Sequence, residues 1–230
     1  MTAGLMGQGA VAIWHDIAPQ GRDDFYAWHG QQHMPERVGI PGFLRGRRYI
    51  GVGARLEFFN LYETSTVAVP QGEDYAQRLN NPTPWTLAAV KHFRSVSRSI
   101  CSVGFSQGHT QGGLLATLRY DVAPENADAH LAAMRGQMLP ELASRPGIAG
   151  VHLLVADAQA SGVPNAEQRA RGVKNSVPAW ILVVEGWADE APFVSGVQAA
   201  CAPSVMEPLG GMGPFELDVY RHQITVIKPD

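Results

Sequence analysis

The chain has 230 residues, of which 45% are hydrophobic and 17% are charged. This length suits one large domain or two small ones, and the composition excludes a disordered chain. No apolar run is long enough to cross a bilayer, so no membrane partner is expected. The net charge of -3, with no basic run longer than Arg45, Arg47 and Arg48, argues against nucleic acid as the main partner.

The N-terminal segment lacks the features of a secretory signal. It has no basic region, and its short apolar stretch is interrupted by His15 and Asp16. Cys101 and Cys201 are far apart and fit neither a disulfide framework nor the ligand spacing of a zinc site. These features predict a cytoplasmic protein with free, buried thiols.

The first half of the chain is predicted to follow the order strand, helix, strand, strand, helix, strand. An apolar run of strand formers ends at the turn Ala18-Pro19, and the helix after it stops at Pro41-Gly42. Pro84 suits the first position of the second helix. The predicted strands are 10–15, 44–52, 55–64 and 96–105, and the predicted helices are 22–38 and 84–94.

The second half repeats this plan. Residues 16–42 align without a gap on residues 121–147, with ten of 27 positions identical where chance would give roughly two. The shared residues are mostly turn residues, so the repeat is structural. The predicted strands of this half are 114–120, 151–156, 179–187 and 216–226. An extra segment, 157–176, is rich in Gly, Asn, Gln and Ala and is predicted to be a long exposed insertion.

A βαββαβ unit forms an antiparallel sheet with both helices on one face, the ferredoxin-like plan. Two such sheets can close against each other by their uncovered faces. The sequence therefore predicts an α+β fold made by tandem duplication of a ferredoxin-like βαββαβ unit. Repeat 1 would span residues 1–106, a linker with the sequence QGHTQGG residues 107–113, and a degenerate repeat 2 residues 114–230. Closure within one chain or in a homodimer stays open.

The strongest motif is Phe25-x-x-Trp28-x4-His33-Met34-Pro35, followed by Gly39-Ile40-Pro41-Gly42-Phe43 and Tyr49. It resembles the EthD-like branch of the dimeric α+β barrel superfamily, whose members carry an aromatic-rich first helix, a His-x-Pro turn and a Leu/Ile-Pro-Gly strand entry. The resemblance covers about residues 25–49 and implies a barrel with a cavity between two sheets. Relatives include lactone isomerases, polyketide cyclases, cofactor-free monooxygenases, dehydratases and haem-binding proteins, so the fold does not choose the reaction.

His33 is the candidate catalytic residue, because an imidazole can take or give a proton near neutral pH. The equivalent position in the second half is Met138, and Trp28 is replaced there by Ala133, which predicts one site per chain. In the other interpretation, His33 caps the helix end by bonding a backbone carbonyl.

His29 lies four residues before His33 on the same helix face, a spacing that can bind a metal with a third ligand. The intervening residues do not form an H-E-x-x-H motif, so no metal is predicted. Glu36 has a counterpart, Glu141, in the half without these histidines, which indicates a structural role for Glu36.

Further residues are candidates for binding a substrate. Either Trp14 or His15 faces the cavity, because neighbouring residues of a strand point to opposite faces. Asn60 is an amide in an otherwise apolar strand and should be paired. The predicted substrate-binding residues are Trp28, Tyr49, Asn60, Trp85, His15 and His29.

The motif Gly104-x-Ser106-x-Gly108 matches the nucleophile elbow of α/β-hydrolases, but the chain continues into a linker and a strand instead of a helix. A serine hydrolase is therefore not predicted. The favoured hypothesis is cofactor-independent acid/base chemistry of the lyase, isomerase or cyclase type on a small apolar carbonyl or phenolic compound. Haem binding through His33, His29 or His92 is the alternative, and a non-catalytic binding or assembly module is the third.

Overall fold

The computed structural model describes residues 4–172 and 176–228. It contains eight antiparallel strands, with helices between them along the chain. The predicted insertion is therefore described except for residues 173–175. The elements of the first half are β1 (Gly9–Ile17), α1 (Arg22–Trp28), α2 (Met34–Val38), β2 (Phe43–Gly51), β3 (Phe58–Thr64), α3 (Glu73–Asn80), α4 (Pro84–Ala89) and β4 (Phe93–Gly108). Those of the second half are β5 (Leu114–Val122), α5 (Ala127–Ala133), α6 (Leu139–Ala143), β6 (Ile148–Ala156), α7 (Ala158–Ser161), α8 (Ala166–Arg171), β7 (Trp180–Gly186), α9 (Glu190–Ala200), α10 (Pro203–Met206) and β8 (Gly211–Ile227).

The strands form one closed barrel in the order β1-β3-β2-β8-β5-β7-β6-β4. Two long strands make the closure. β4 pairs with β1 over its first part and with β6 over its last part, and β8 pairs in the same way with β5 and then β2. The predicted α+β class with antiparallel sheets is confirmed, and the two sheets close within one chain. The predicted strands 96–105 and 216–226 were too short because each long strand serves two neighbours.

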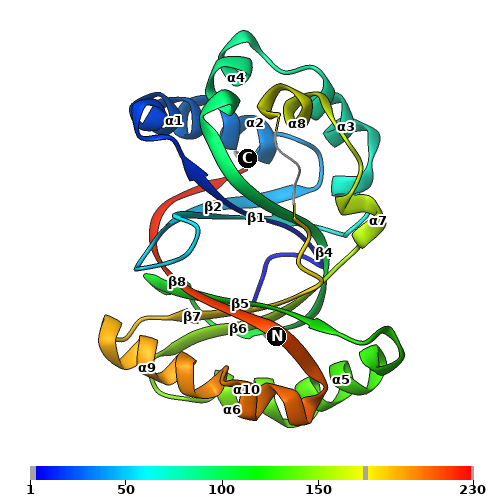
Figure 1. Cartoon of the computed structure of the whole chain (residues 1–230), viewed down its shortest axis with the longest axis vertical. Helices are drawn as coiled ribbons and strands as arrows, with labels where there is room; N and C mark the ends of the chain where they lie inside the picture. Colours follow the sequence, from blue (N-terminus) through cyan, green and yellow to red (C-terminus); the bar gives the residue numbers. More distant parts are fainter. Residues whose placement is uncertain (1–3, 173–175, 229–230) are drawn as a thin grey trace.

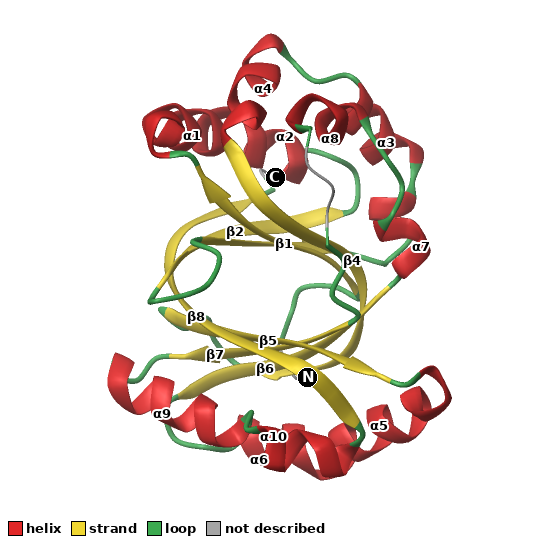
Figure 2. Ribbon diagram, viewed as in Figure 1, coloured by secondary structure: helices red, strands yellow, loops and turns green. Residues whose placement is uncertain are grey.

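The helices lie on the outside of the barrel in two layers (Figures 1 and 2). α1, α2, α3 and α4 cover one side, and α5, α6, α9 and α10 cover the opposite side. The predicted insertion is exposed over part of its described length, including residues 162–164, and buried at Ser161, Asn165 and Glu167. Residues 158–161 and 166–171 form α7 and α8, which leave the second half and pack beside the helices of the first.

Side chains from both halves fill the barrel interior. Trp14 is fully buried there, packs against Phe59 with ring centroids 4.9 Å apart, and donates its indole N–H to Thr117 Oγ1 at 3.1 Å. Its neighbour His15 therefore points outward, toward the helices. The structure therefore assigns Trp14 to the barrel interior and His15 to the helix layer.

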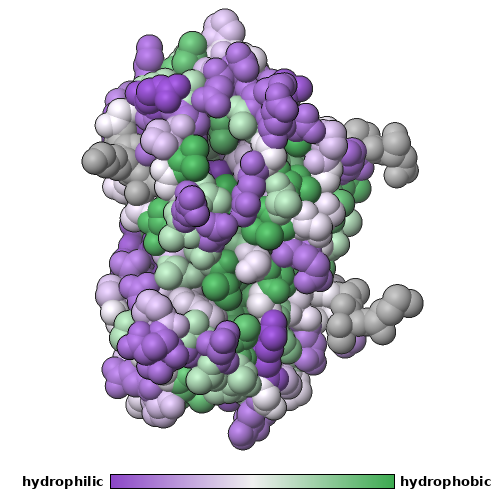
Figure 3. Space-filling model, turned by 90° about the vertical axis from the view of Figure 1, so that its right-hand side faces the viewer, coloured by the Kyte–Doolittle hydropathy of each residue, from purple (hydrophilic) through white to green (hydrophobic). Residues whose placement is uncertain are grey.

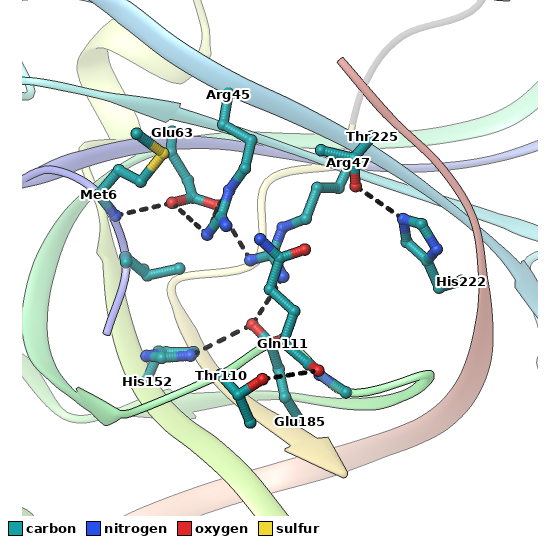
Figure 4. A network of polar contacts seen from close by, with 12 residues as sticks. Met6, Arg45, Arg47, Glu63, Thr110, Gln111, His152, Glu185, His222 and Thr225 are labelled. Carbon is teal, nitrogen blue, oxygen red and sulfur yellow. Dashed lines mark hydrogen bonds and ion pairs between the residues drawn. The ribbon is translucent and has the colours of Figure 1, made fainter. Parts of the chain in front are cut away.

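A buried charge network also lies inside the barrel (Figure 4). Arg47 of β2 is fully buried and pairs with Glu63 of β3 at 2.9 Å and with Glu185 of β7 at 2.8 Å. Arg45 pairs with Glu63, and His152 lies 3.3 Å from Glu185. Burial alone would raise the pKa of Glu185, but Arg47 and His152 lower it to about 2. The network thus joins the two halves across the interior.

Replacing Arg47 by Met should lower the free energy of unfolding by about 3–5 kcal/mol, because it removes the arginine partner of the buried Glu185 and one of the two arginine partners of Glu63. Urea denaturation followed by circular dichroism measures the loss. Arg221→Met is the matched control, since Arg221 pairs with Glu190 on the surface, where a pair contributes at most about 1 kcal/mol. Equal losses in the two variants would contradict a special role for the interior pair.

Candidate functional site

A small cavity of about 60 Å³ lies between the outer face of the first-half strands and the helices that cover them. This volume is well below the roughly 150 Å³ of an engineered cavity that binds benzene, so it suits a reacting group or waters better than a whole ligand. It is lined by Ile13, His15, Trp28, His29, His33, Arg37, Asn60, Tyr62, Tyr75, Leu79, Val90, Phe93, Val96, Arg98, Asn165, Glu167 and Arg171. Three imidazoles therefore face one small space.

The helix that carries His29 and His33 is continuous but irregular. A π-helical turn, His29–His33, joins α1 to α2, and such turns occur frequently at functional sites. The two imidazoles stack with centroids 5.2 Å apart, and His33 lies on the indole of Trp28 at 4.3 Å. The second half has the same π-turn at Met134–Met138 without these side chains. Both halves thus have the π-helical turn, but only the first half places histidines on it.

His33 Nδ1 has no hydrogen-bond partner within the part of the chain that the structure describes, and it is sealed from solvent. The interpretation of His33 as a helix cap is therefore wrong. The residue as a whole is half-buried. Burial, followed by the charge of Arg37, holds the pKa of His33 well below its usual value. His33 is thus an uncharged base at neutral pH, and it lines the cavity.

His15 and Asn60 face the cavity from neighbouring strands, β1 and β3. Asn60 Nδ2 lies 3.0 Å from His15 Nε2, and Asn60 Oδ1 is buried without a partner among the described residues. The expected partner of the strand amide is therefore a histidine. Burial is the main cause that lowers the pKa of His15 to about 3.

His29 is held from the other side by an arginine. Arg48 Nη1 lies 3.3 Å from His29 Nδ1, so the guanidinium donates and the imidazole accepts. Burial and then the charge of Arg48 keep the pKa of His29 well below its usual value. All three imidazoles of the cavity are therefore neutral.

The charged groups at the cavity come partly from the segment that was predicted to be exposed. Glu167 of α8 forms a buried ion pair with Arg37 of α2, and Asn165 and Arg171 line the same space. The backbone N–H of Ala166 also bonds Asn80 Oδ1 at 3.1 Å. The second half thus closes the site of the first half.

A neutral imidazole is also the form of histidine that binds a metal ion. Among the described residues, no three His, Cys, Asp or Glu side chains come together in a way that could hold a metal ion.

No helix in the described part of the chain is both long and apolar enough to span a membrane.

Five of the seven predicted site residues lie together at this cavity: His33, Trp28, Asn60, His15 and His29. Tyr49 does not, because its register on β2 turns it into the barrel, where it packs beside Phe59. Trp85 is also absent from the lining, and its indole N–H donates to Asp24 at 2.8 Å instead.

Sequence reasoning missed the charged residues of the cavity, which are Arg37, Arg98, Glu167 and Arg171. Side chains of a strand alternate between its two faces, so Arg98 of β4 shares the helix-facing side of the sheet with Val96 and Ile100. This two-residue period was the signal in the sequence that could have placed Arg98 at the cavity. No pattern linked residues 165–171 to the first half.

Comparison with known proteins identifies the fold. The chain is similar over 100% of its length to 97% of an anthrone oxidase-like protein, with 13% identity and a TM-score of 0.65. It is similar over 97% of its length to 94% of a heme-binding protein from Thermus thermophilus, with 13% identity and a TM-score of 0.52. The fold is the ferredoxin-like dimeric α+β barrel. Such identities show the fold alone.

A third structure of this fold comes from Fusobacterium nucleatum and is named provisionally as a monooxygenase; it has 10% identity and a TM-score of 0.58 over 97% of this chain and 96% of its own. No protein-family model matches the chain, and neither does any curated protein. The barrel thus occurs among proteins with different named activities, and the site must decide the function.

The buried histidines predict a loss of stability in acid. The unfolded chain binds a proton at a His pKa near 6.5, whereas His15 in the fold does so only near 3. Stability is therefore lost as the pH falls from about 6.5 toward 3, by about 1.4 kcal/mol per pH unit for this residue.

Urea midpoints measured from pH 7 to pH 5 check this slope. His15→Gln should lose its share of the slope, while the exposed His109→Gln should keep the slope of the wild type. If His15→Gln retained the full wild-type slope, the assignment of a buried neutral His15 would be wrong.

Proposed function

We propose that the chain is an enzyme that removes a proton from a small, largely apolar carbonyl or phenolic compound, with His33 as the general base. The observation that carries this proposal is an imidazole in the wall of a small cavity whose buried Nδ1 has no hydrogen-bond partner among the described residues. Such a group is expensive to bury unless a ligand completes its hydrogen bond. A general base must also be uncharged at the working pH, as the lowered pKa of His33 allows.

The neighbours of His33 support the same step. The indole of Trp28 packs on its ring, and the Trp28 N–H is bound to Thr86 Oγ1 at 3.1 Å, so both rings are fixed. Asn60 Oδ1, which has no partner among the described residues, can accept a hydrogen bond from a substrate hydroxyl. Because burial and then the charge of Arg37 disfavour a protonated His33, the proton is returned to the product. Proton return fits an isomerase, lyase or cyclase reaction.

We also propose an EthD-like protein made by duplication, with repeat 1 at residues 1–106, repeat 2 at residues 114–230 and one site per chain. The second half supports this count. Its buried His130 is bonded to Tyr120 Oη at 2.8 Å and to the carbonyl of Leu209 at 2.7 Å, so it has no free nitrogen. A cytoplasmic location and assembly as a homodimer remain part of this proposal.

The names of the structural neighbours suggest a first probe. Anthrone is a ketone with acidic protons beside its rings, and its deprotonation gives a phenolate-like anion. We expect the wild-type chain to accelerate exchange of these protons with deuterium in D₂O, measured by proton NMR. His33→Gln should slow the enzymatic rate by about 10²–10⁴-fold.

The exposed His109→Gln is the control and should exchange at the wild-type rate. An oxygen electrode, run in parallel, shows whether dioxygen is a co-substrate. Unchanged exchange in a folded His33→Gln variant, measured with any carbon acid that the wild type turns over, would refute the role of His33.

Haem is the second candidate, because one structural neighbour is named as a heme-binding protein. His33 has an unpartnered imidazole nitrogen of the kind that an iron ligand needs. The space does not fit: even with the adjoining pocket of about 270 Å³, the cavity of about 60 Å³ only reaches the roughly 300 Å³ of the smallest usual ligand pockets, and haem is a large cofactor. We therefore expect no saturable Soret band in a titration of the protein with hemin. A band that saturates at one haem per chain and shifts in His33→Gln would reverse the order of the two candidates.

A further inference from the structure

A second pocket, of about 270 Å³, adjoins the histidine cavity. The two spaces share four lining residues, namely Tyr75, Leu79, Arg98 and Asn165. The pocket lies between α3, β4 and the segment 157–165, and its volume approaches that of typical ligand sites. It opens on the face that carries α3 and α7, which Figure 3 turns toward the viewer; hydrophobic side chains gather on this face among hydrophilic ones.

The walls of this pocket are mainly apolar. They include Tyr75, Leu79, Ile100, Ala160 and Val163. Its one acid among the described residues, Asp157, is already engaged, since its carboxylate accepts from the N–H of Ala160 at 2.9 Å and from Gln71 at 3.1 Å. A flat hydrophobic body would therefore find contacts here and no free carboxylate.

Arg98 is the unusual group at the junction of the two spaces. It is 7% exposed and, among the described residues, forms no ion pair. Its guanidinium bonds Tyr75 Oη at 3.3 Å and lies 5.7 Å from the centre of that ring. Of the other buried arginines, Arg37, Arg45, Arg47 and Arg119 each have a carboxylate partner, whereas Arg48 bonds Gln223 and His29. A buried cation without an anion is costly, and a ligand anion would offset that cost.

The charged side chains around the histidine cavity favour an anionic ligand. Three guanidiniums, Arg37, Arg98 and Arg171, face the histidine cavity, and Glu167 is the one acid of its described lining. The three imidazoles are uncharged. Arg37 is paired with Glu167, whereas Arg98 has no acidic partner among the described lining residues.

We infer that the two spaces form one substrate site, in which the larger pocket holds an apolar ring and Arg98 binds a negatively charged oxygen on that ring, a carboxylate or a phenolate. This inference rests on the proposed function, because it names the substrate class for the same cavity. A guanidinium binds a carboxylate through two parallel N–H donors, which also sets the orientation of the ring. Arg98 therefore directs the ligand toward the histidines.

The experiment compares a carboxylate with its neutral ester on the whole chain. Binding of 2-naphthoate and methyl 2-naphthoate is measured by isothermal titration calorimetry near neutral pH. The wild type should bind the acid at least about 10-fold more tightly than the ester, as expected for a hydrogen bond to a charged group. In Arg98→Met the acid should lose about that factor and the ester should change little. The exposed Arg94→Met, on the same strand, should behave as the wild type.

A second pair, 4-nitrophenol at mildly alkaline pH and 4-nitroanisole, distinguishes a phenolate from a carboxylate as the preferred anion. Equal affinities of the wild type for charged and neutral members of both pairs would overturn the inference, and so would failure of all four probes to bind. This wild-type comparison decides the matter even if Arg98→Met does not fold. These titrations measure binding alone and need no turnover. A failure of the proton-transfer proposal would therefore leave anion binding intact, and the two failures are distinguishable.

Discussion

The ion pairs of Arg47 inside the barrel are the interaction on which the rest of the structure depends. A guanidinium from the first half that is fully buried between Glu63 and Glu185 requires the two sheets to meet in one register. The long strands β4 and β8 supply the same constraint from the backbone, because each pairs with both halves. The histidine cavity lies on the other side of the first-half strands, between their outer faces and the helices.

The outer faces of the two halves have the same helical frame and different contents. Where the first half places His29 and His33 on its π-turn, the second half has Met134 and Met138, and Met134 belongs to a dense apolar cluster. The second half instead contributes α8, whose Glu167 reaches Arg37. The second half therefore packs on the first half and covers its cavity, and the histidines of that cavity all come from the first half.

Much of this could be predicted from the sequence, because periodicity fixes which residues share a face. The spacing of Trp28, His29 and His33 on a helix and the apolar strand around Asn60 brought five site residues together. The sequence could not show which face of β1 is turned inward. Trp14 and His15 point to opposite faces, and only the closure of the barrel assigns the indole to the interior. The side chain of Tyr49 also points into the barrel, and for the same reason the sequence could not show this. The contribution of α8 was hidden, because a contact between residues 37 and 167 leaves no local pattern.

The same burial has two electrostatic consequences at the site. Removing water lowers the pKa of His33, which keeps the base uncharged, and it also strengthens the field of the arginines around it. An anion bound at Arg98 would partly offset that field, so the pKa of a nearby imidazole would rise when the ligand binds. The base would then be held neutral in the empty cavity and become better able to accept a proton once the substrate is present. Positive charge at this cavity can thus select the substrate and adjust the base that acts on it.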